Sequence, residues 1–244
     1  MRKLFLGAVV ALSALLGVVG AASAIDGTQT VAVKLTKSKA GTKEKPKSVG
    51  TLKVTTATTP GPAMPAGSFA VTNAVISFDK NLVFNAGAFK ACSTSDLATI
   101  DTKCKGLAKG QVGKGSAKGS ALGQIEALDV KAYNGPKSGS GYKFYLHVTG
   151  AQPLRIDTVI LAKLSKATGK YGWKLTVPIP PELQKPSGVL ATLTEFITSV
   201  SGTSKGKPYV ALKGCTGGKL NFKGVFSYTD GTSKTATSTS KCSK

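Results

Sequence analysis

The chain has 244 residues and a formal net charge of +22, because 33 lysines and arginines outnumber 11 aspartates and glutamates. Beyond the first two dozen residues the positive charge is almost entirely lysine, with Arg155 the one arginine and His147 the one histidine. Lysine is a hydrated point charge, whereas arginine offers a planar fork that reads phosphate geometry. The composition therefore argues against specific nucleic-acid recognition and against catalysis that depends on several histidines.

The first 24 residues have the pattern of a secretion signal. Arg2-Lys3 precedes an apolar run from Leu4 to Val19, and the small residues Ala22-Ser23-Ala24 follow. An uncleaved membrane anchor is the alternative, but the run is short for a span of about 20 residues. We expect cleavage after Ala24, a secreted protein comprising residues 25–244, and no transmembrane segment in the mature chain.

Alternating polar and apolar residues, interrupted by turn residues, predict strands along the mature chain. In the clearest case, Tyr142, Phe144 and Leu146 share one face. His147 lies on the other face, where we expect an ordinary exposed side chain. The segment 190–200 also fits a helix, but its threonines and valines favour a strand. The predicted strands are 28–36, 49–56, 69–78, 125–133, 142–148, 154–164, 171–179, 190–200, 208–212, 220–228 and the last stretch up to Cys242.

About ten strands with few helices predict an all-β fold, an antiparallel β-sandwich forming a single domain over 25–244, although two smaller sandwiches would also fit the length. One or two short helical turns are expected between Asn85 and Ile100. Loops are predicted at Lys37 to Lys47 and Thr58 to Gly67, and a hairpin turn at Asp230-Gly231. The glycine-rich stretch Gly110 to Ser120 is interpreted as a strand at the edge of a sheet with glycine bulges, with an anion-binding nest as the alternative.

Four cysteines in an exported chain predict two disulfides. Three pairings are possible, and we favour Cys92–Cys104 with Cys215–Cys242, because each pair flanks one local segment. Zinc would require cysteines two to four residues apart, so neither a metal nor another cofactor is predicted.

No catalytic residue is predicted. Gly202-Thr-Ser204-Lys-Gly206 matches the nucleophile elbow of hydrolases, but Pro208 follows too soon for a helix and the histidine lies upstream. The strand phase of His147 favours a solvent-exposed side chain over a general base. Of the eleven carboxylates, no pair is marked out for glycoside hydrolysis. We expect a protein that is not an enzyme.

Two cysteine-flanked motifs occur in the chain. The first is Cys92-x11-Cys104 followed by Val112-Gly113-x-Gly115-x-Ala117, and the second is a closing hairpin with Tyr228-x-Asp230-Gly231 before Cys242. Together they resemble uncharacterised secreted β-sandwich proteins of high-GC Gram-positive bacteria over about half of the mature chain. The Cys-Pro pair usual in that group is absent, since Lys105 follows Cys104. The resemblance implies secretion, two disulfides and an all-β fold, and it implies no catalytic residue.

The expected function is that of a non-catalytic protein at a cell surface or in a matrix, which contacts anionic cell-wall polymer or polysaccharide through lysine. An extracellular carbohydrate-binding module, an Asp/Glu-dependent glycoside hydrolase and a purely structural envelope protein are the alternatives, and the sequence leaves the oligomeric state open. The lysines chosen as the anion-binding set are Lys37, Lys39, Lys43, Lys45, Lys47, Lys105, Lys109, Lys114 and Lys118.

Overall fold

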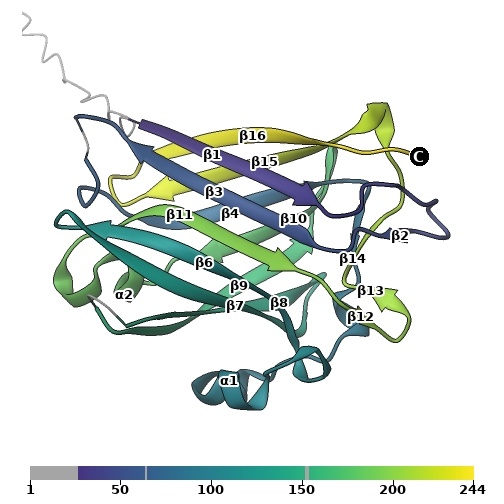
Figure 1. The fold of residues 1–244 in the computed structure, drawn as a ribbon, viewed down its shortest axis with the longest axis horizontal. Coiled ribbons are helices and arrows are strands. Elements are labelled where there is room, and N and C mark those ends of the chain that lie inside the picture. Colours follow the sequence, from purple (N-terminus) through teal and green to yellow (C-terminus); the bar gives the residue numbers. More distant parts are fainter. Residues whose placement is uncertain (1–26, 64, 152–153) are drawn as a thin grey trace, which may run out of the picture.

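Antiparallel strands dominate the computed structural model, which describes residues 27–63, 65–151 and 154–244 (Figure 1). The predicted signal segment and its cleavage site lie outside the described residues. Within the described part, none of the helices has the length and apolar character needed to cross a membrane.

The main sheet has eleven strands in the order β1-β3-β11-β6-β7-β8-β9-β10-β4-β15-β16, and each neighbouring pair is antiparallel. These strands are β1 (Gly27–Leu35), β3 (Leu52–Pro60), β4 (Val71–Asp79), β6 (Gln111–Ala121), β7 (Gln124–Ser138), β8 (Gly141–Gly150), β9 (Ile156–Lys166), β10 (Tyr171–Pro178), β11 (Thr192–Val200), β15 (Lys219–Tyr228) and β16 (Ser233–Lys241).

Short elements fill the connections. A three-stranded sheet consists of β2 (Lys47–Ser48), β14 (Val210–Leu212) and β5 (Leu82–Phe84), and a hairpin pairs β12 (Thr203–Ser204) with β13 (Lys207–Pro208). The helices are α1 (Ile100–Lys103), α2 (Pro181–Gln184) and the 3-10 turns η1 (Ala86–Ala88), η2 (Thr94–Thr99), η3 (Leu107–Lys109), η4 (Pro186–Gly188) and η5 (Thr216–Gly218).

The sheet wraps around its core until its two edge strands lie against each other (Figure 1). Lys234 Nζ on β16 donates to the carbonyl oxygen of Gly27 on β1 at 3.0 Å. Tyr228 Oη on β15 donates to Gln29 Oε1 on β1 at 2.8 Å. The loop after β1 and the residues after β16 are also joined, because Ala40 N donates to Ser243 O at 2.7 Å. The all-β antiparallel prediction is confirmed. The main hydrogen-bonded sheet is continuous, so the division into two sheets that a sandwich implies is not confirmed.

Apolar side chains of alternate strand positions face inward and form one large core, in which Phe78, Leu146 and Phe222 are fully buried. A second, smaller cluster lies on the outer face of the sheet. There the disulfide-bridged segment containing η2 and α1 covers Tyr133 on β7 and Tyr145 on β8. β8 is therefore buried on both faces over Phe144 to Val148.

Both predicted disulfides are confirmed. Cys92 and Cys104 are bonded with a Cα–Cα distance of 5.6 Å, and Cys215 and Cys242 with one of 5.8 Å. The first bridge closes the segment on the outer face, and the second ties the start of β15 to the end of β16. The sulfurs are thus not available as thiolate ligands for zinc.

The glycine-rich stretch forms β6, as a strand was predicted, but its placement at a sheet edge is wrong. β6 lies between β11 and β7 in the interior of the sheet. A Cβ atom on Gly115 would lie 1.8 Å from the carbonyl oxygen of Ile197 on β11, and one on Gly113 would lie 2.2 Å from that of Ser199. Glycine is required here because the neighbouring backbone leaves no room for a side chain. The ladder with β7 is irregular between Gln111 and Gly113, consistent with a bulge.

Candidate functional site

Lysines gather at one end of the wrapped sheet. Since neighbouring strands are antiparallel, successive connections alternate between the two ends, and one set of them brings distant parts of the chain together. We call part of this set the lysine-rich end: the connections 36–51, 167–170 and 201–218, together with Lys80 and the last residues 242–244. The rest of the long connection 81–110, which carries Asp96 and Asp101, and the turn 139–140 are not included. The lysine-rich end carries Lys37, Lys39, Lys43, Lys45, Lys47, Lys80, Lys170, Lys205, Lys207, Lys213 and Lys244, while Glu44 is the one acidic residue in these described segments.

Backbone hydrogen bonds join these segments into one surface. Gly41 N donates to Leu212 O at 2.9 Å, which places the loop after β1 beside β14. Lys213 N donates to Asn81 O at 2.9 Å, and Lys80 N donates to Lys170 O at 3.3 Å. The lysines therefore share one end because the topology brings their loops together, although they are spread over most of the sequence.

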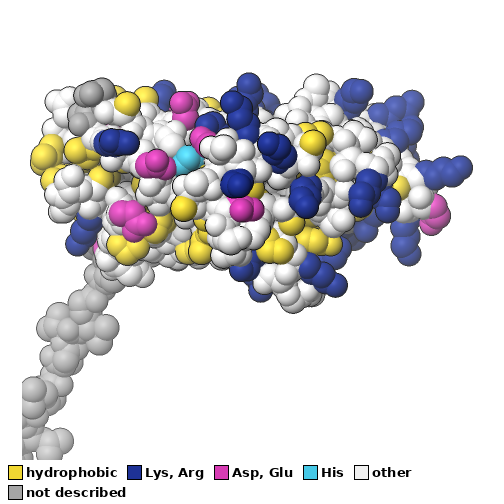
Figure 2. Space-filling model, turned by 90° about the horizontal axis from the view of Figure 1, so that it is seen from below, with side chains coloured by type: hydrophobic (Ala, Val, Ile, Leu, Met, Phe, Trp, Pro, Cys, Tyr) yellow, Lys and Arg dark blue, Asp and Glu magenta, His cyan; other side chains and the backbone are white. Residues whose placement is uncertain are grey.

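The opposite end has a different character. Its connections, as far as they are described, are 61–63 and 65–70, 122–123, 151 and 154–155, 179–191 and 229–232. Their charged residues are Arg155, Glu182, Lys185 and Asp230. Figure 2 shows the contrast from below: lysine and arginine side chains cover the right-hand end, and apolar and acidic side chains are prominent on the left. The positive charge is thus segregated along the long axis of the molecule.

The structure divides the nine lysines predicted as the anion-binding set. The five lysines from 37 to 47 lie at the lysine-rich end. Lys105 lies just before the turn η3, and Lys109 is the last residue of this turn. Leu107 of η3 packs so closely on the loop before β12 that a Cβ atom on Gly202 would lie 2.6 Å from its side chain. These two lysines are therefore neighbours of the lysine-rich end.

Lys114 and Lys118 are placed elsewhere. Both lie on the outer face of β6 in the middle of the sheet, and Lys118 Nζ forms an ion pair with Glu195 at 3.3 Å. Sequence reasoning in turn missed Lys80, Lys170, Lys205, Lys207, Lys213 and Lys244. These lysines share a position in connections at the same end of the sheet. This shared position can be recognised only once the strand order is known.

Like charges also face each other across strand pairs. Lys34 is opposite Lys53 in the β1–β3 ladder, Lys114 is opposite Lys131 in the β6–β7 ladder, and Lys219 is opposite Lys241 in the β15–β16 ladder, next to the lysine-rich end. Directly opposed like charges destabilise a sheet by a few tenths of a kcal/mol to about 1 kcal/mol per pair. Negative groups placed near these pairs would relieve the repulsion.

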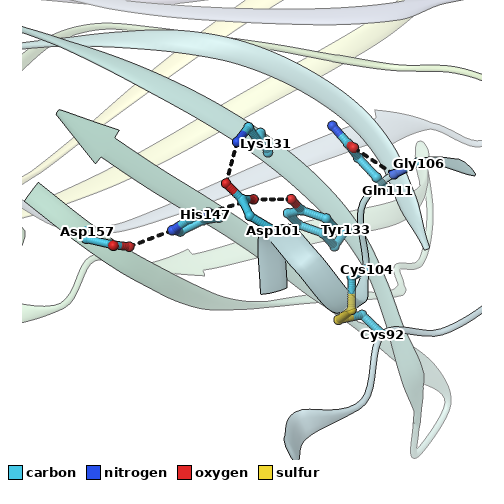
Figure 3. Close-up of polar contacts among 9 residues, drawn as sticks. All are labelled: Cys92, Asp101, Cys104, Gly106, Gln111, Lys131, Tyr133, His147 and Asp157. Atoms are coloured by element: carbon cyan, nitrogen blue, oxygen red, sulfur yellow. Dashed lines mark hydrogen bonds and ion pairs between the residues drawn. A yellow bond between two sulfur atoms is a disulfide. The ribbon is translucent and has the colours of Figure 1, made fainter. Parts of the chain in front are cut away.

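His147 is the centre of a polar cluster on the outer face of the sheet (Figure 3). Its Nδ1 lies 3.0 Å from Asp101 Oδ1 on α1, and its Nε2 lies 2.7 Å from Asp157 Oδ1 on β9. Asp101 also accepts hydrogen bonds from the Tyr133 hydroxyl and from Lys131 Nζ. The predicted face of His147 is correct, but the expectation of an exposed side chain is wrong: the residue is 7% exposed.

The cause of this burial lies far along the chain from β8. The segment between Cys92 and Cys104 folds over the outer face and places α1 above His147, so a position that alternation assigns to solvent becomes enclosed. Burial alone would raise the pKa of Asp101, but hydrogen bonds from Lys131, Tyr133 and His147 outweigh it and lower this pKa to about 2. Burial and the neighbouring Asp101 carboxylate raise the pKa of Tyr133 above its ordinary value.

The geometry of this cluster favours a structural role, in which it holds the bridged segment against the sheet, over proton transfer. A general base needs a ring nitrogen free to reach a substrate, and both nitrogens of His147 face carboxylates. Its hydrogen bonds join α1 to β8 and β9 and hold the bridged segment on the sheet.

Two aromatic residues that could have stacked a sugar are enclosed. Trp173 is 5% exposed with Lys166 Nζ 3.7 Å from its ring centre, and Tyr145 is fully buried under the bridged segment.

No protein-family model matches this chain, and neither the curated proteins nor the solved structures contain a match. The similarity to secreted proteins of high-GC Gram-positive bacteria therefore stays a prediction.

Proposed function

We propose that this chain is a secreted, non-catalytic protein that attaches to anionic polymers, such as cell-wall phosphate polymers or acidic polysaccharides, through its lysine-rich end. One observation carries the proposal: the segments that define this end bring together eleven lysines and contain one acidic residue, Glu44, whereas the described connections at the other end carry two positive and two negative residues. A surface of one sign concentrates counter-ions of the other and speeds their association.

The type of residue indicates the type of recognition. Lysine attracts an anion without fixing its geometry, and the one arginine outside the predicted signal, Arg155, lies at the other end. Exposed charges act over a screening length of about 8 Å at physiological ionic strength. Binding should therefore depend on the charge density of the polymer rather than on the identity of its units.

Two further observations support the rest of the proposal. Both ring nitrogens of His147 are occupied by Asp101 and Asp157, which leaves this histidine without the free nitrogen that a catalytic base needs. Two disulfides favour an oxidising compartment, in agreement with the predicted signal in residues 1–24.

The test compares two triple variants with the same change in net charge. Lys43→Glu, Lys45→Glu and Lys47→Glu reverse exposed lysines at the lysine-rich end. Lys114→Glu, Lys163→Glu and Lys174→Glu reverse exposed lysines on the outer face of the sheet. Affinities for dextran sulfate, polyphosphate and neutral dextran are measured by calorimetry at several salt concentrations.

We expect the triple variant at Lys43, Lys45 and Lys47 to bind both polyanions at least tenfold more weakly than the unaltered protein. The triple variant on the outer face of the sheet should differ from the unaltered protein in affinity by less than threefold. The logarithm of the affinity should fall linearly with that of the salt concentration. Equal losses in the two variants would refute the role of the lysine-rich end. Comparable binding to neutral dextran would refute the anionic ligand.

A further inference from the structure

A cavity of about 310 Å³ lies inside the wrapped sheet. Its floor consists of buried core residues, including Ile76, Phe78 and Leu146. At the end opposite to the lysine-rich end, it is lined by Leu183 of α2 and by Leu122 at the tip of the β6–β7 hairpin, and Leu122 is 79% exposed. The cavity therefore extends from an apolar rim at the surface into the core.

Native cores are packed with few voids larger than a water molecule, so a void of this size requires an explanation. Its volume falls at the lower bound of ligand pockets, which hold about 300–1,000 Å³. An apolar cavity of about 150 Å³ accommodates benzene, with six carbon atoms. By the same ratio this cavity accommodates roughly twelve carbon atoms.

Glu126 is the one charged residue among the described residues that line the cavity. It occupies a core position on β7, in phase with Leu128 and Val130, and is 8% exposed. Its Oε2 accepts a hydrogen bond from Leu154 N at 3.0 Å. Its Oε1 is fully buried and has no hydrogen-bond partner among residues 27–63, 65–151 and 154–244.

An orphaned buried acceptor costs about 1–3 kcal/mol, more if it is charged. A carboxylate in this position is therefore expected to meet a donor that comes from outside the protein. Thr198, which also lines the cavity, has a buried hydroxyl without a partner in the described residues. It faces Gly115 in the β11–β6 ladder, whereas Glu126 faces Gly119, four residues along the same strand. The two orphaned groups are thus roughly 13 Å apart along the strand direction, at about 3.3 Å per residue.

We infer that the cavity is a binding site for a single apolar chain of roughly twelve carbon atoms with a hydrogen-bond-donating end group, a hydroxyl or an amine. The donor binds Glu126 Oε1 near the rim, and the chain lies along the apolar wall toward Thr198. A fatty-acid carboxylate is disfavoured, because its charge would meet that of Glu126. This site is separate from the lysine-rich end, so the inference does not depend on whether the protein binds polyanions.

Gly119 allows the cavity to be filled without disturbing the backbone. It lines the cavity opposite Glu126, and a Cβ atom built on it would have its nearest neighbour, Glu126 Cβ, at 4.0 Å. Gly119→Val therefore places a side chain in the space meant for the ligand. Ser116→Val adds a similar side chain on the exposed outer face of the same strand and serves as the control.

The experiment titrates decan-1-ol, decylamine and decanoate into the purified protein by calorimetry. The alcohol and the amine should bind with one-to-one stoichiometry, and decanoate at least tenfold more weakly. Glu126→Gln should weaken decylamine binding at least tenfold and improve decanoate binding, because the amide can donate to a carboxylate. Gly119→Val should abolish all three, whereas Ser116→Val should leave them unchanged.

The inference is refuted if neither the alcohol nor the amine binds the unaltered protein. It is also refuted if decanoate binds as tightly as decan-1-ol, or if Gly119→Val binds as well as the control. If Glu126→Gln fails to fold, Gly119→Val and the comparison of the three end groups still decide the question. Polyanion affinity should be the same for Gly119→Val and the unaltered protein, which separates the two sites.

Discussion

Asp101 and His147 are 46 residues apart in the chain, and their side chains lie 3.0 Å apart between Oδ1 and Nδ1. This contact joins the disulfide-bridged segment to the middle of the main sheet. It turns an outward-facing strand position into an interior one and makes Asp101 the acceptor of three side-chain donors.

Asp101→Asn should make the free energy of unfolding depend less on pH in the acidic range. The pKa of Asp101 is lowered from 3.8 to about 2 in the folded protein, so its contribution is fully present above pH 4 and is lost as the pH falls toward 2. Because the Asp101 side chain is 37% exposed, we expect the substitution to lower the free energy of unfolding by about 1 kcal/mol at neutral pH. Urea unfolding at intervals from pH 6 to pH 2.5 should show the gap between the two proteins closing below pH 4. A gap that stays constant would contradict the prediction.

His147→Ala should lower the free energy of unfolding by about 1–3 kcal/mol, because it empties a position that is 7% exposed and removes the hydrogen bonds to Asp101 and Asp157. Asp157→Asn is the matched control: the Asp157 side chain is 68% exposed, so a cost below about 1 kcal/mol is expected. Both variants should bind polyanions like the unaltered protein. Loss of polyanion binding by a folded His147→Ala protein would show that the histidine has a functional role.

Two glycines on β6 should respond in opposite ways to valine. Gly115→Val should cost more than about 3 kcal/mol or prevent folding, because its Cβ would lie 1.8 Å from a backbone oxygen of β11. Gly119→Val should be neutral or stabilising by up to about 1 kcal/mol, since the strand gains a β-branched residue in open space. Thermal unfolding of both purified variants tests this, and similar losses in the two would refute the assigned geometry.

The two disulfides should contribute similar amounts by closing loops in the unfolded chain. For sequence separations of 12 and 27, we expect about 3 and about 3.5 kcal/mol respectively. Urea unfolding of the paired Cys→Ser variants measures these values. Loss of Cys92–Cys104 should in addition expose Tyr133 and Tyr145 to solvent, which near-ultraviolet circular dichroism can detect. An unchanged aromatic spectrum would indicate that the segment stays in place without its bridge.

Local patterns were sufficient for the strands and the disulfides. Alternation such as that of Leu220 to Tyr228 reflects one buried face, and each cysteine pair encloses a single local segment. The segment 190–200 was ambiguous by spacing and forms β11, in line with its threonine and valine content. These features depend on neighbours within a few dozen residues, and such neighbours are visible in the sequence.

Features that depend on strand order were not predictable. β11 lies between β3 and β6, far from both in sequence, and this placement puts Gly110 to Ser120 in the interior of the sheet. The same order decides which lysines meet at one end. Glu126 is an intermediate case, because its phase with Leu128 was readable from the sequence, but the cavity beside it was not.

The meeting of β1 and β16 has a consequence for how the chain reaches this structure. The strand that starts at Gly27 acquires its second neighbour only when the strand that ends at Lys241 is available. Folding that depends on contacts between such distant segments is slow. The main sheet can therefore be completed only after the residues up to Lys241 have been synthesised.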